Sequence, residues 1–135
     1  MAVLYLDASA VLRALLEKGT SPEVEARIEA AESLVTSRLS LVESARALAR
    51  LRTQPKVKDS AISRVELALD ELWNRCAIWE LSPAICDHAA RLAPRSTLRT
   101  LDALHLATYL AVRRSFDEVE LLTTDERLAN AAGEQ

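Results

Sequence analysis

The sequence predicts a single α/β domain in which helices flank a parallel β-sheet. Four short apolar runs alternate with segments of helical periodicity, and this alternation favours strands paired in parallel through crossover helices. The chain has 135 residues, of which 50% are hydrophobic and 27% charged, which suits one globular domain with a substantial core. We therefore expect one domain over residues 1–135, without a linker or an internal repeat.

Local signals place each element in order. Strands are expected at the β-rich apolar runs 2–6, 33–37, 77–81 and 119–123. Helices are expected where apolar residues recur at helical spacing, at 9–18, 22–31, 40–52, 59–76, 83–92, 100–114 and 125–132. Ser9 is expected to cap the first helix, and Ser21-Pro22 and Ser82-Pro83 each pair a cap with a proline at the first helical position. Residues 53–55 should end the third helix, and 94–99 should form a loop.

Composition excludes several kinds of site. Gly19 and Gly133 are the only glycines, so a glycine-rich phosphate-binding loop is impossible. An aromatic content of 4% argues against a stacking platform for single-stranded bases. Cys76 and Cys86 are too few for a four-sulfur zinc site and are expected to be reduced thiols. No targeting or membrane segment is visible, so we expect a cytoplasmic protein.

The charge is unevenly distributed along the chain. The net charge is -3, yet residues 38–64 hold seven basic and two acidic residues, and residues 91–114 hold five basic and one acidic residue. Basic segments of this kind favour contact with a phosphate backbone. An equally simple interpretation is that these arginines and lysines cover solvated helix faces.

Four carboxylates are expected at one edge of the sheet. Asp7 follows the first strand directly, and Asp125 lies two residues beyond the fourth. Glu43 and Asp102 lie near the starts of two helices at the same edge. In open α/β sheets, ligands bind beyond the carboxyl ends of the strands. Carboxylates gathered there favour a bound cation, and oxygen ligands suit Mg²⁺ or Mn²⁺.

Each acid also has a structural explanation. Glu43 would complete a capping box with Ser40, and Asp102 and Asp125 would each complement a helix N-terminus. Asp7 would simply end a strand. The coincidence of four acids at one edge favours a metal site over four separate caps.

Four stretches of the chain resemble the signature motifs of PIN domains. They are VLYLDASA at 3–10, LSLVES at 39–44, TLDALHLAT at 100–108 and LLTTDERL at 121–128. Their order and the chain length are similar to those of the VapC-type ribonuclease toxins of bacterial toxin–antitoxin pairs. The resemblance implies a three-layer sandwich with a parallel sheet of order 3-2-1-4. Members of the family often have a short fifth strand as well.

The resemblance also implies a function and a set of site residues. Asp7, Glu43, Asp102 and Asp125 would be the catalytic acids that bind Mg²⁺ or Mn²⁺, with the hydroxyls of Ser9 and Thr123 beside the first and last of them. The chain would be a metal-dependent endoribonuclease that cleaves RNA by metal-activated water. Its partners would be RNA, a VapB-type antitoxin and a second copy in a homodimer, with no membrane.

The remaining candidates are weaker. Arg46 and Arg99 each lie three residues from an acid and are candidates for substrate phosphate contacts. His105 follows Asp102 by three residues, but a partly buried structural histidine explains it more simply. Cys86 and His88, even with Cys76, are too sparse for zinc.

Two other functions stay open on the sequence. One is a Mg²⁺-dependent phosphotransferase or phosphoacceptor domain, and the other is a non-catalytic module that binds RNA or protein. The helices at 9–18, 21–31 and 59–76 are expected to leave apolar surface uncovered, where an antitoxin helix or a second subunit would dock.

Overall fold

The computed structural model describes residues 3–92 and 98–135 of the chain. Most of the loop expected at 94–99 lies outside the described residues. Four parallel strands form one sheet: β1 (Val3–Leu6), β2 (Ser33–Ser37), β3 (Cys76–Trp79) and β4 (Val119–Leu122). Their order is β3-β2-β1-β4, which confirms the predicted topology. The residues described contain no fifth strand.

The strand register aligns the carboxyl ends of the strands. Leu6, the last residue of β1, lies opposite Thr36 of β2 and Leu122, the last residue of β4. Loops that leave these three strands therefore begin close together in space. This alignment brings residues from distant parts of the sequence to one edge.

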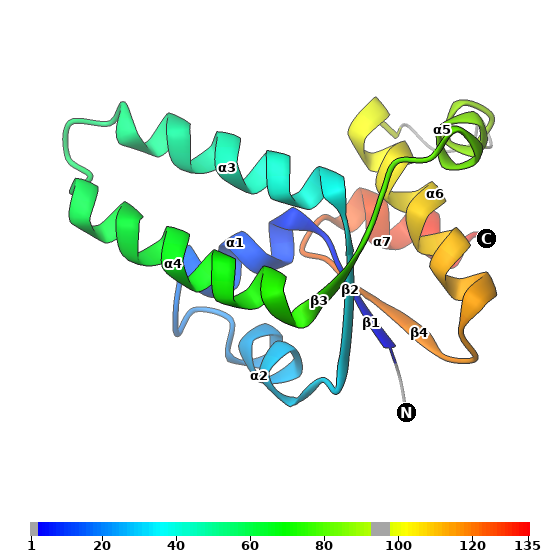
Figure 1. The fold of residues 1–135 in the computed structure, drawn as a ribbon, viewed down its shortest axis with the longest axis horizontal. Coiled ribbons are helices and arrows are strands. Elements are labelled where there is room, and N and C mark those ends of the chain that lie inside the picture. The colour runs from blue at the N-terminus through cyan, green and yellow to red at the C-terminus, as the bar shows by residue number, and fades with distance from the viewer. Residues whose placement is uncertain (1–2, 93–97) are drawn as a thin grey trace.

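Helices cover both faces of the sheet (Figure 1). On one side lie α1 (Ala8–Leu16), α2 (Pro22–Ala30), α3 (Arg38–Arg52) and α4 (Asp59–Arg75). On the other lie α5 (Pro83–Ala90), α6 (Thr100–Ser115) and α7 (Glu126–Gly133). The three predicted layers are thus confirmed.

Strand β1 supplies side chains to both hydrophobic cores. Leu4 and Leu6 belong to the core beneath α1–α4, whereas Val3 and Tyr5 belong to the core beneath α6 and α7. Successive side chains of a strand point to opposite faces, so a central strand buried on both sides is apolar throughout. All four residues of β1 are buried.

Three helix caps differ from those expected. Ser21 lies at the N-cap position of α2, but its side chain makes no capping hydrogen bond. At α1 and α3 a different residue forms the cap. The side chain of Asp7 caps α1 by accepting a hydrogen bond from the amide of Ala10, whereas Ser9 lies inside the helix. Ser37, not Ser40, caps α3, so this helix begins at Arg38. In both places the chain passes from strand to helix with almost no loop, and the cap falls on the residue at the strand's end. The other predicted boundaries agree with the structure to within two residues.

Helices α3 and α4 form an antiparallel pair with ion pairs close to the loop that joins them. The guanidinium of Arg52 contacts the carboxylates of Asp59, at 3.0 Å, and Glu66. Arg38, at the start of α3, forms a bidentate ion pair with the carboxylate of Glu80, which follows β3. Part of the basic charge of segment 38–64 is therefore paired within the protein. None of the described helices is long and apolar enough to cross a membrane.

Candidate active site at the carboxyl edge of the sheet

The four predicted acids all lie at the carboxyl edge of the sheet. Asp7 follows β1 directly, and Asp125 is the N-cap of α7, just beyond β4. Asp102 lies in the first turn of α6. Glu43 lies in the second turn of α3, because the helix begins earlier than the sequence suggested.

Three of these acids line one cavity of about 610 Å³. Its lining residues come from α3, α6 and the start of α7, and are Glu43, Arg99, Thr100, Leu101, Asp102, Asp125 and Arg127. Arg99 lines this cavity, while Arg46 is exposed and does not. A substrate phosphate contact by either arginine stays a prediction. Arg127 was missed by the sequence analysis, although its position two residues after Asp125 was a usable signal.

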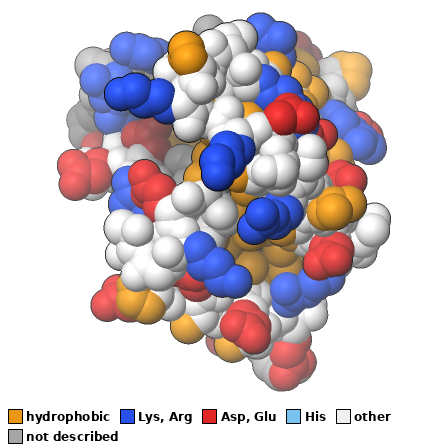
Figure 2. Space-filling model, turned by 90° about the vertical axis from the view of Figure 1, so that its left-hand side faces the viewer, with side chains coloured by type: hydrophobic (Ala, Val, Ile, Leu, Met, Phe, Trp, Pro, Cys, Tyr) orange, Lys and Arg blue, Asp and Glu red, His pale blue; other side chains and the backbone are white. Residues whose placement is uncertain are grey.

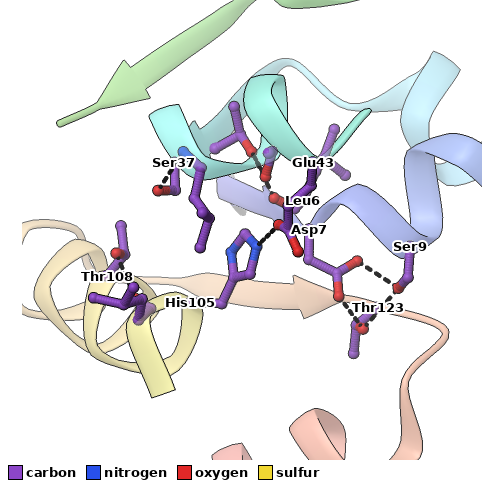
Figure 3. A network of polar contacts seen from close by, with 12 residues as sticks. Leu6, Asp7, Ser9, Ser37, Glu43, His105, Thr108 and Thr123 are labelled. Atoms are coloured by element: carbon purple, nitrogen blue, oxygen red, sulfur yellow. Dashed lines mark hydrogen bonds and ion pairs between the residues drawn. The ribbon is translucent and has the colours of Figure 1, made fainter. Parts of the chain in front are cut away.

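Asp7 lies beside the cavity and is buried, with 4% of its surface exposed. The hydroxyl of Ser9 donates to its Oδ1 at 2.7 Å, and that of Thr123 donates to its Oδ2 at 2.5 Å (Figure 3). Each hydroxyl also accepts a backbone N–H, from Thr124 and Asp125 respectively. These hydrogen bonds fix Asp7 between the ends of β1 and β4. Ser9 lies next to the first acid, whereas the hydroxyl of Thr123, expected beside the last acid, donates to Asp7 and contacts Asp125 only by accepting the backbone N–H of that residue.

Glu43 makes a contact that the sequence did not predict. Its Oε1 lies 2.6 Å from Nε2 of His105, whose Nδ1 lies 2.9 Å from the hydroxyl of Tyr5 (Figure 3). The capping box expected between Ser40 and Glu43 is wrong, since Ser40 is buried within α3 and its hydroxyl contacts Thr36. Capping therefore does not explain Glu43.

The carboxylates of the edge repel one another. Partial burial raises the pKa of Asp102 above its ordinary value, and the negative charge of Asp125 raises it further. Glu43 and Asp7 act in the same direction, while His105 opposes them. The ionised form of Asp102 is thus disfavoured by its neighbours, which is the condition that a bound cation relieves.

The donor set fits a hard divalent cation in its chemistry. All four acids offer oxygen ligands, which Mg²⁺ and Mn²⁺ prefer. Within residues 3–92 and 98–135, no three acidic, histidine or cysteine side chains stand close enough together to hold an ion. Asp7 is turned to Ser9 and Thr123, and Glu43 to His105. Ligation by these four residues stays a prediction.

A second cavity, of about 630 Å³, lies between α1, α2 and α4, where the sequence analysis expected a docking surface. We call it the apolar groove. Its apolar lining consists of Ala14, Leu15, Ile28, Ala61, Val65, Ala68 and Leu72. Its charged lining consists of Lys18, Glu25, Glu29, Arg64, Glu71 and Arg75. Figure 2 shows the side of the molecule where α3 ends and α4 begins, with hydrophobic side chains in a recess between charged ones.

Comparison with known proteins identifies similar chains. Residues 4–134 match the family described as the PIN domain. Ribonuclease VapC45 of Mycobacterium tuberculosis is 31% identical over 112 residues, covering 83% of this chain and 78% of the relative. Ribonuclease VapC46 of the same species is 31% identical over 133 residues, covering 98% and 92%. A toxin–antitoxin complex from Klebsiella pneumoniae has a similar fold, with a TM-score of 0.62, 21% identity and coverage of 92% and 87%.

Proposed function

The chain belongs to the PIN domain family, and from this premise we propose that it is a VapC-type endoribonuclease, the toxin of a toxin–antitoxin pair. The observation that carries the proposal is the cavity that Glu43, Asp102 and Asp125 line together with Arg99 and Arg127. Acids and arginines in one cavity suit a substrate whose phosphates are negative and whose cleavage needs a cation. The names of the two mycobacterial relatives agree with this activity.

The roles of the residues follow from their positions. Arg99 and Arg127 would hold phosphates of the RNA backbone at the rim of the cavity. Glu43, Asp102, Asp125 and Asp7 would hold Mg²⁺ or Mn²⁺, and this ion, when bound, supplies an activated water and stabilises the charge that develops on the phosphodiester. Ser9 and Thr123 would keep the carboxylate of Asp7 oriented, since both donate to it.

Cleavage through the RNA's own 2′-hydroxyl is poorly supported. That route needs an acid–base pair poised near neutral pH, usually two histidines. Both ring nitrogens of His105 are already hydrogen-bonded, and His88 lies on α5 and does not line the cavity. Hydrolysis by water therefore suits this site better.

The termini of the products test the proposed function. We expect a 5′-phosphate and a 3′-hydroxyl on each cut RNA, and loss of cleavage when EDTA removes divalent ions. The assay would use a panel of structured RNAs and map both ends by ligation and mass spectrometry. A 2′,3′-cyclic phosphate that persists in EDTA would overturn the scheme.

The apolar groove is our proposed docking site for the antitoxin. An amphipathic helix buries its apolar face in a groove of this kind. The apolar floor of the groove would receive that face, and basic and acidic residues at its rim would pair with charges on either side. The fold is also that of a solved toxin–antitoxin complex. The homodimer expected from the resemblance, and a cytoplasmic location, stay predictions.

The two alternative functions are less well supported. A phosphoacceptor needs a carboxylate oxygen free to attack, yet Asp7 is buried and both of its oxygens accept hydrogen bonds. A module that only binds RNA would not need Asp102 and Asp125 to lie so close that the negative charge of Asp125 raises the pKa of Asp102. Comparison of RNA binding with RNA cleavage in an Asp102→Asn variant separates this last case from a nuclease.

A further inference from the structure

A buried tyrosine and a buried histidine connect the core to the active-site cavity. Tyr5, on the central strand β1, is 0% exposed, and His105, on α6, is 3% exposed. Tyr5 packs edge-on against the rings of both His105 and Tyr109, with centroid distances of 6.1 and 5.9 Å. Both side chains of the pair are therefore confined by the core, whereas Glu43 is partly exposed, at 26% of its side chain.

The chemistry of the three side chains decides which group donates in the hydrogen bonds from Tyr5 to His105 and from His105 to Glu43. An ionised carboxylate can only accept, so Nε2 of His105 must carry the proton that is shared with Glu43. In the neutral ring, Nδ1 then has a free lone pair that accepts the O–H of Tyr5. Burial, with a smaller contribution from the charge of Asp7, raises the pKa of Tyr5 far above its ordinary value. Tyr5 is thus protonated and able to donate.

The hydrogen bond from His105 restricts the rotamers of the Glu43 side chain. A glutamate side chain on a helix has several accessible rotamers, and restricting them costs entropy when a ligand binds. A donor that is itself locked in the core removes this freedom before binding. Buried partners of ligating side chains typically contribute about 10- to 100-fold in metal affinity or activity.

We propose that Tyr5 and His105 are positioning residues that hold the carboxylate of Glu43 in place for metal binding and RNA cleavage. The inference rests on the proposed function. Tyr5 acts only through His105, and His105 acts only through Glu43. The effect of losing the tyrosine hydroxyl should therefore vanish once Glu43 itself has been disabled.

The test compares two isosteric variants in the same core. Tyr5→Phe removes the hydroxyl that fixes His105, while Tyr109→Phe removes a hydroxyl of the same aromatic cluster that reaches only the Val119 carbonyl, at 3.5 Å. We expect Tyr5→Phe to lower kcat about 10-fold with little change in KM, and to weaken Mn²⁺ binding in calorimetry by a similar factor. Tyr109→Phe should stay within about twofold of the wild type in both measurements.

A double mutant separates positioning from a general loss of core stability. In a Glu43→Gln background, Tyr5→Phe should change neither kcat nor Mn²⁺ affinity further. An equal loss in both backgrounds, or an equal effect of Tyr109→Phe, would overturn the proposal. Thermal unfolding of each variant would verify that it is folded.

A spectroscopic measurement keeps this inference separate from the proposed function. Nitrogen-15 chemical shifts of His105 should report a proton on Nε2, and these shifts should change in Tyr5→Phe. If the chain cleaves no RNA, Mn²⁺ calorimetry and these shifts still decide whether Tyr5 and His105 hold Glu43. A ring protonated at Nδ1 alone would refute the relay whatever the activity.

Discussion

The acidic cavity and the apolar groove are nearly equal in volume, about 610 and 630 Å³, but opposite in character. The cavity gathers acids and arginines at the edge of the sheet, where partial burial and the negative charge of Asp125 raise the pKa of Asp102. The groove leaves apolar side chains of α1 and α4 partly open to solvent over the larger hydrophobic core, namely Leu15, Ala61, Val65 and Ala68. Each holds an unfavourable feature that a ligand would relieve, a cation in one and an apolar helix in the other.

This difference indicates that the proposed catalysis and partner binding use different helices of the fold. The cavity uses α3, α6 and the start of α7, and shares no lining residue with the groove. Substitutions more than about 10 Å apart without shared partners usually act independently. Cleavage and antitoxin binding should therefore be separable by single mutations, and the predictions below test that separation.

The largest effect is expected from Asp102→Asn. This variant keeps the shape of the side chain but removes a charge that the proposed cation needs, so cleavage should fall by about 10²- to 10³-fold. Binding of the antitoxin at the groove should not change. Asp117→Asn is the matched control, because Asp117 is exposed and precedes β4, at the opposite edge of the sheet. Equal losses in the two variants would disprove the assignment.

A smaller effect is expected from Ala68→Glu in the groove. A charge placed on its apolar floor should weaken antitoxin binding about 10- to 100-fold, since the docked helix would desolvate it. RNA cleavage should stay within about twofold of the wild type. Leu67→Glu is the control on the same helix, because Leu67 is 66% exposed and does not line the groove. Binding would be measured by calorimetry with the antitoxin encoded beside the toxin gene, and similar losses from both variants would place the partner elsewhere.

The smallest effect concerns the stability of the metal-free protein. Because the folded state raises the pKa of Asp102, its ionised form destabilises the fold at pH values above that pKa. Asp102→Asn should therefore unfold about 1–3 °C higher than the wild type at pH 7. The difference should disappear as the pH falls below about 3.9, the ordinary pKa of an aspartate, where the carboxyl becomes protonated in the unfolded as well as the folded state. Calorimetric melting in EDTA across this range measures it, and a variant less stable at pH 7 would show that repulsion does not dominate at the edge.

The sequence alone determined the alternation of strands and helices and the edge at which the four acids lie. Those features depend on local periodicity and on one rule of topology, that parallel strands point their carboxyl ends to the same side. Asp7 and Asp125 could be placed because each lies within three residues of a strand end. Arg99 could be placed because it precedes the helix that carries Asp102.

Only the tertiary structure decided what each of these side chains contacts. Glu43 meets His105 across 62 positions of sequence, and His105 meets Tyr5 across 100. Neither pair has a local signal, and the local pattern at Ser40 and Glu43 even favoured a capping box that does not form. Contacts of this kind depend on how α3 and α6 pack against opposite faces of β1 and β2. Packing of distant elements is set by the whole core rather than by the residues that flank each side chain.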